Sequence, residues 1–141
     1  MRTVIELFIL EMIRIKENIR KNHDAWNERH PFRRWCISSK SHHKQYIFNI
    51  SLDELETLAI NTPICPICGT PLNFIQSRHS GKNNKMSTYS PTLDRINNEQ
   101  EMNIDNVWII CNACNRAKSD KPLKEFIKYC KMIVNKFDTG V

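Results

Sequence analysis

Four of the six cysteines stand in two CxxC pairs, CPIC at residues 65–68 and CNAC at residues 111–114. Thiolates at this spacing are typical ligands of tetrahedral zinc, with Zn–S bonds of about 2.3 Å. Two such pairs brought together give a closed site that leaves no coordination position for a substrate. We therefore expect a structural zinc ion on Cys65, Cys68, Cys111 and Cys114, and any reaction to take place elsewhere.

The stretch SPTLDRINNE, residues 90–99, lies between the two pairs and places the acid Asp94 beside the cation Arg95. Such a pair can be an incidental turn at the surface. It can also be the working end of a metal-dependent site, because carboxylate oxygens suit hard cations such as Mg²⁺ and an arginine fork suits phosphate. The rest of the sequence is needed to choose between a surface turn and a metal site.

The chain carries a formal charge of +6 and a pI near 9.1, which permits a polyanionic partner without requiring one. The distribution of charge is more informative than the sum. No acid occurs between Glu28 and Asp53, or between Thr57 and Leu93, and both intervals contain cations and histidines. Clustered cations of this kind suit a phosphate backbone. We expect contacts with a phosphate backbone from Arg33, Arg34, Lys40, Lys44 and Arg78.

Residues 3–28 are predicted to form one helix, with apolar side chains at helical spacing from Ile5 to Trp26. Pro31 should end this helix, because a proline disfavours the helical conformation of the residue before it. The apolar face predicts a core helix or a packing helix in a dimer, and the sequence does not choose between these. The basic, aromatic segment 32–50 predicts a short helix and a strand. A capping box, SLDE at 51–54, then begins a further short helix.

Two predicted strands, TLDRI at 92–96 and VWII at 107–110, could pair as a hairpin with a long connection. NACNRAKSD at 112–120 predicts a short helix, and a last helix should begin at Pro122, with apolar residues at i, i+3 and i+4. The two remaining cysteines, Cys36 and Cys130, are expected to be packing residues.

The length of 141 residues predicts about one domain. No apolar run reaches the roughly 20 residues of a membrane span, and the N-terminal segment lacks a cleavage site of the secretory kind. CxxC pairs without an export signal favour a reducing compartment. We expect a soluble cytoplasmic protein of a bacterial or phage-infected cell, with no membrane partner; a homodimer is compatible with the sequence.

The segments CPICG, SPTLDRI and DNVWIICNACNRAKSD resemble, in order and spacing, the HNH endonucleases, including phage-type members that carry the same DR pair. The resemblance covers residues 63–121. It implies an α+β fold with a ββα-metal core on a four-cysteine zinc site, flanked by N- and C-terminal helices. It also implies a helical and basic DNA-contacting segment at residues 1–50, and a nuclease-like zinc domain with its C-terminal helix at residues 51–141.

The site residues of the family carry over onto matching positions of this chain. Asp94 would give a carboxylate oxygen to a catalytic Mg²⁺ or Mn²⁺, and Asn115 would offer its amide oxygen to the same ion. Asn106 would tie the loop to the hairpin and so orient the first-strand residue. Arg116 and Lys118 would face phosphate, with solvated helix cations as the alternative.

Arg95 departs from the family pattern, which places there the histidine that activates the attacking water. Arginine has a pKa above about 12 and cannot act as a base near neutral pH. It is suited instead to gripping the scissile phosphate. The base would then be His79, His42, His43 or Tyr89, or a metal-bound hydroxide would need no protein base.

Three functions are compatible with these observations. The first is a metal-dependent endonuclease that hydrolyses DNA phosphodiester bonds. The second is a zinc-stabilised DNA-binding module that is catalytically impaired because it lost the base. The third, a zinc-ribbon protein that binds other proteins, explains the cysteines but leaves LDRI and DNV as coincidences.

Overall fold

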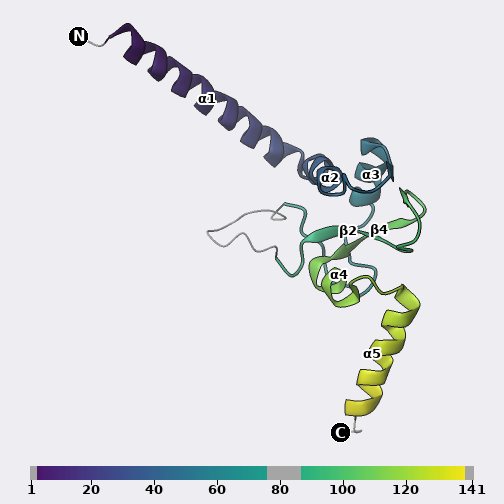
Figure 1. The fold of residues 1–141 in the computed structure, drawn as a ribbon. Coiled ribbons are helices and arrows are strands. Elements are labelled where there is room, and N and C mark those ends of the chain that lie inside the picture. Colours follow the sequence, from purple (N-terminus) through teal and green to yellow (C-terminus); the bar gives the residue numbers. More distant parts are fainter. Residues whose placement is uncertain (1–2, 76–86, 139–141) are drawn as a thin grey trace.

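The computed structural model describes residues 3–75 and 87–138, which form an α+β fold of five helices and two small sheets (Figure 1). The chain order is α1 (Val4–Arg29), α2 (Pro31–His42), β1 (Phe48–Asn49), α3 (Leu52–Ile60), β2 (Pro91–Arg95), β3 (Met102–Asn103), β4 (Val107–Cys111), α4 (Asn112–Lys118) and α5 (Leu123–Phe137). This order confirms the α+β class. The described helices include none that is long and apolar enough to cross a membrane.

Local sequence signals set the helix boundaries. Thr3 and Ser51 each cap a helix with a complete capping box, since the hydroxyl accepts from a backbone N–H three residues on and Glu6 or Glu54 reaches back. Pro31 ends α1 and becomes the first residue of α2, where its missing N–H has no cost. The predicted helix starts and the break at residues 30–31 are therefore confirmed.

The antiparallel hairpin of β2 and β4 lies at the centre of the fold and continues directly into α4. In its register Asp94 stands opposite Trp108, and Arg95 stands opposite Val107. The predicted pairing of the two strands is confirmed. A second, parallel pair joins β1 to β3, so that the segment after α2 lies beside the loop that connects the hairpin strands.

The core lies between the α2–α3 pair and the hairpin. Cys36 and Leu55 are fully buried, together with Ile110 of β4. Trp35 spans the two layers, because its ring is buried and its Nε1–H donates to the Pro91 carbonyl at 3.0 Å. This packing confirms the expected role of Cys36, whose burial raises the pKa of its thiol to about 12.

Helix α1 takes no part in this core. It extends away from the rest of the chain in Figure 1, and none of its residues is buried among the described residues. A role as a core helix, one of the two predicted from its apolar face, is therefore wrong for the single chain. The other role, as a packing helix between copies, is untouched by this finding.

Candidate metal centre and adjoining polar pocket

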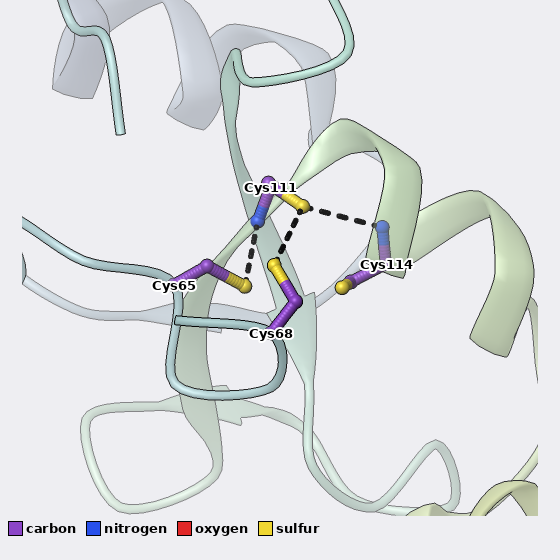
Figure 2. A group of neighbouring side chains, drawn as sticks. All are labelled: Cys65, Cys68, Cys111 and Cys114. Carbon is purple, nitrogen blue, oxygen red and sulfur yellow. Dashed lines mark hydrogen bonds between the residues drawn. The ribbon is translucent and has the colours of Figure 1, made fainter. Parts of the chain in front are cut away.

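The four CxxC cysteines come together, and their sulfurs all lie within 4.8 Å of one another (Figure 2). The Sγ atoms of Cys68 and Cys111 are 3.7 Å apart. Tetrahedral zinc with bonds of about 2.3 Å needs sulfur pairs separated by about 3.8 Å. The cluster therefore has the ligand type, ligand number and spacing of a structural zinc site, and it could hold such an ion with little movement.

A turn, a strand and a helix supply the sulfurs. Cys65 and Cys68 lie in a tight turn closed by the Gly69 N–H, which donates to the Cys65 carbonyl at 2.9 Å. Gly69 has a φ of +73°, a left-handed conformation that glycine adopts without steric cost. Cys111 ends β4, and Cys114 lies in the first turn of α4. The cluster thus fastens this turn to the junction of hairpin and helix.

Hydrogen bonds to sulfur prepare the cluster for a cation. The hydroxyl and amide of Thr70 lower the pKa of Cys68 to about 6, with a Cys68 Sγ to Thr70 Oγ1 distance of 3.1 Å. The Cys111 N–H donates to Cys65 Sγ at 3.3 Å. Burial instead raises the pKa of Cys111 and Cys114. A bound dication would offset that burial cost, because it favours the thiolate form of its ligands.

Asp94 lies on β2 and is held by two donors that share its Oδ2 atom. Trp108 Nε1–H donates to it at 2.8 Å, and the Lys118 ammonium lies 3.0 Å away. The Lys118 side chain is 0% exposed and that of Asp94 is 11% exposed. Lys118 was expected to face phosphate; its complete burial against Asp94 corrects that expectation, because a buried ammonium cannot reach a DNA backbone.

A polar pocket of about 270 Å³ adjoins this ion pair. Asp94 lines it from β2 and Asn115 lines it from α4, so the two predicted ligands of a divalent ion face the same space. His43, Asp120 and Arg95 also line the pocket. The donor set of carboxylate and amide oxygens fits the preference of Mg²⁺ or Mn²⁺, which keep several waters and bind few protein groups.

Arg95 is engaged by its own loop. Its Nη1 donates to the carbonyls of Asn98 at 2.7 Å and Gln100 at 3.2 Å, and its guanidinium lies 4.3 Å from the ring centre of Tyr46. These contacts brace the loop after β2 against the segment after α2. The expected grip on a phosphate would require the fork to share or leave these partners.

Asn106 is buried and holds the same loop from the other side. Its Oδ1 accepts from the Asn97 N–H at 2.9 Å, and its Nδ2 donates to the carbonyls of Asn97 at 3.0 Å and Glu101 at 2.9 Å. These three bonds connect the loop to the start of β4. Their geometry matches the loop-tying role that the resemblance implies for this position.

The cations expected to contact DNA have different surroundings. Arg33 pairs with Asp53 and Glu56 of α3, and Arg34 donates to the carbonyls of Phe74 and Ile75 at 3.2 and 3.0 Å. These two arginines therefore support the fold. Lys40 lies 5.4 Å from the ring centre of Phe48, Lys44 and Arg116 are exposed, and Arg78 lies outside the described residues.

The described candidates for the general base differ in whether they reach the pocket. His43 lines the pocket, whereas His42 is exposed with its Nδ1 2.7 Å from the Ser38 carbonyl, and Tyr89 is 52% exposed away from the pocket lining. His79 lies outside the described residues. Sequence reasoning missed Asp120 and Tyr46, which reach the pocket through the turn after α4 and the segment before β1. No periodicity marks those segments, so only the tertiary contacts reveal them.

No protein-family model matches the chain, and no curated protein and no solved structure is significantly similar to it.

Proposed function

We propose that this protein is a metal-dependent endonuclease that hydrolyses DNA phosphodiester bonds at the polar pocket. The observation that carries the proposal is the meeting of Asp94 and Asn115 in one pocket, with Asn115 directly after the cluster residue Cys114 in α4. The two residues come from different elements, and the resemblance to HNH endonucleases assigns both to the same catalytic ion. A closed four-thiolate site is structural, so the pocket is where chemistry would occur.

Asp94 and Asn115 would hold Mg²⁺ or Mn²⁺ through their side-chain oxygens. Both contacts of Asp94 use Oδ2, which leaves Oδ1 without a partner among residues 3–75 and 87–138. Trp108 and Lys118 fix the orientation of the carboxylate. Bound there, the divalent ion supplies positive charge against the phosphoryl oxygens and the leaving oxygen.

His43 is the side chain that we assign as general base. Its Nδ1 lies 2.8 Å from the Ser39 carbonyl, which can only accept, so Nδ1 carries the hydrogen. The neutral ring therefore has its lone pair on Nε2, and this atom can take a proton from an attacking water. His43 replaces in this way the histidine that is absent at position 95.

The test is a plasmid cleavage assay with Mg²⁺ or Mn²⁺ on the full chain. We expect cleavage by the wild type and a loss of at least about 100-fold in Asn115→Ala and His43→Gln, the usual scale for a lost ligand or base. Asn135→Ala, which replaces an exposed asparagine of α5, is the matched control and should cleave normally. Wild-type protein that never cleaves, or an Asn115→Ala variant as active as wild type, would refute the assignment.

A second candidate is the catalytically impaired DNA-binding module. Asp94 already pairs with Lys118, and Arg95 already donates to the Asn98 carbonyl. These contacts favour the second candidate, because they compete with a divalent ion for Asp94 and with a phosphate for Arg95. DNA binding without cleavage under any divalent ion supports this candidate. Absence of DNA binding at low salt supports the third function, a protein-binding zinc ribbon.

A further inference from the structure

Helix α1 presents a large apolar surface that the other described residues, 30–75 and 87–138, leave uncovered. Its exposed apolar side chains include Ile5 at 71%, Phe8 at 66% and Ile19 at 63%. The helix has 26 residues, which makes it about 39 Å long at 1.5 Å per residue. Isolated helices depend on packing of an apolar face for most of their stability. An uncovered face of this extent marks an interaction surface.

Six of the apolar residues of α1, together with Asn22, follow the heptad spacing of a coiled coil. Intervals of three and four residues alternate through the seven seam positions, a and d of the heptad. The seam residues are Ile5, Phe8, Met12, Ile15, Ile19, Asn22 and Trp26. Val4, Leu7, Leu10 and Ile13 are also exposed and lie outside these positions, but they occur only in the first half of the helix. The seam is the part of the apolar surface that continues along α1 to Trp26, as pairing along the whole helix requires.

We propose that α1 forms a parallel two-stranded coiled coil with α1 of a second copy of this chain. The charges beside the seam fix the direction. Glu11 lies at position g and Lys16 at the following position e, and parallel helices bring g of one chain against that e of the other. Two Glu11–Lys16 pairs, related by symmetry, then flank the seam.

An antiparallel pair would gain nothing from these charges. In that arrangement g positions face g positions and e positions face e positions. Glu11 is the one charged residue at the g positions of α1, while the e positions carry Lys16 and His23, so no pair of opposite sign can form. An in-register parallel pair also places Asn22 opposite its symmetry mate, where the two amides can hydrogen bond.

The available area suits a dimer. Burying one large apolar side chain removes on the order of 100 Å² from water. The six apolar seam residues and the adjacent Ile9 therefore supply on the order of 700 Å² per chain, close to the roughly 800 Å² per partner of a specific interface. The inference does not depend on the proposed nuclease function.

The mass of the full chain in solution tests the pairing. Sedimentation equilibrium should give twice the chain mass of 16.7 kDa. Ile15→Glu, in the seam, should give the monomer mass, whereas Ile13→Glu should leave the dimer intact. The two isoleucines are matched, because they are 43% and 48% exposed in the single chain. Both variants should retain zinc, since no residue of α1 is buried in the core.

Charge reversal tests the direction of the helices. Glu11→Lys or Lys16→Glu alone should weaken dimerisation by about 2- to 30-fold, the scale of two exposed ion pairs. The double variant Glu11→Lys with Lys16→Glu should restore it, because the two pairs re-form with exchanged signs. Failure of the double variant to restore the dimer would overturn the parallel arrangement. A monomeric wild type, a trimer, or a monomer that binds phosphatidylcholine vesicles would overturn the proposed pairing.

Discussion

The buried pair of Lys118 and Asp94 should make a large, measurable contribution to stability. The Lys118 side chain is 0% exposed, and apart from Asp94 its ammonium has the Ser119 carbonyl as a partner at 3.4 Å. Asp94→Asn would therefore leave a buried charge without a counter-ion, which costs about 3–5 kcal/mol. Lys118→Met should cost less, about 1–3 kcal/mol, because the remaining carboxylate keeps its bond from Trp108.

A double variant measures the interaction energy between the two charges separately from the contribution of each side chain. The combined change Asp94→Asn with Lys118→Met removes both charges, and the amide that replaces the carboxylate still offers an oxygen to the Trp108 N–H. No buried charge is then left without a counter-ion. We therefore expect the double variant to be more stable than the sum of the single changes predicts, by about 2 kcal/mol or more.

Urea unfolding of the zinc-loaded protein, followed by circular dichroism, measures the free energy of unfolding of the wild type, the two single variants and the double variant. Lys121→Met, at an exposed lysine three residues beyond Lys118, is the matched control and should change stability by less than about 0.5 kcal/mol. Single variants that each cost less than about 1 kcal/mol, with no coupling between them, would refute the burial and pairing of Lys118.

Two further predictions concern the frame of the site. Metal analysis should find about one zinc per chain. The zinc should be lost in Cys111→Ser and retained in Cys130→Ser, because Cys130 lies outside the cluster. Equal zinc content in the two variants would contradict the four-thiolate site. Asn106→Ala removes three hydrogen bonds to the loop and should lower the free energy of unfolding by about 3 kcal/mol. The control Asn135→Ala should leave the stability unchanged. A loss under about 1 kcal/mol in Asn106→Ala would show that these bonds do not hold the loop.

Much of the fold could be predicted because its signals are local. The capping box at Ser51 and the break at Pro31 act through neighbouring residues, so the sequence around them suffices. The hairpin follows from two strand-like segments, TLDRI and VWII, that are joined by a polar loop. The cysteine cluster is a long-range feature, yet zinc chemistry requires four ligands, and the two CxxC pairs supply them.

The surroundings of the charged residues could not be predicted in the same way. Nothing in the spacing of NRAKSD distinguishes a solvated lysine from Lys118, whose burial depends on how α4 packs against β2. Arg95 depends likewise on Tyr46, which lies far away in sequence. Helical periodicity in α1 predicted an apolar face correctly, but periodicity does not say whether that face is covered by the same chain.

The charges around the pocket lead to one further expectation. Asp94 and Asp120 supply two negative charges there, while Arg95 lines the same pocket and Lys118 lies 3.0 Å from Asp94. The acids and the cations balance, so the pocket alone offers little net attraction for a divalent cation.

A phosphodiester entering the pocket would add one negative charge to that balance and would face Arg95. Its oxygens would also offer further ligands to the divalent ion. We therefore expect Mg²⁺ to bind the DNA-free protein weakly and the protein–DNA complex more tightly, as measured by calorimetric titration with Asn115→Ala as the control. Tight Mg²⁺ binding to the DNA-free wild type would contradict this charge argument. It would mean that Asp94 exchanges Lys118 for the metal without help from the substrate.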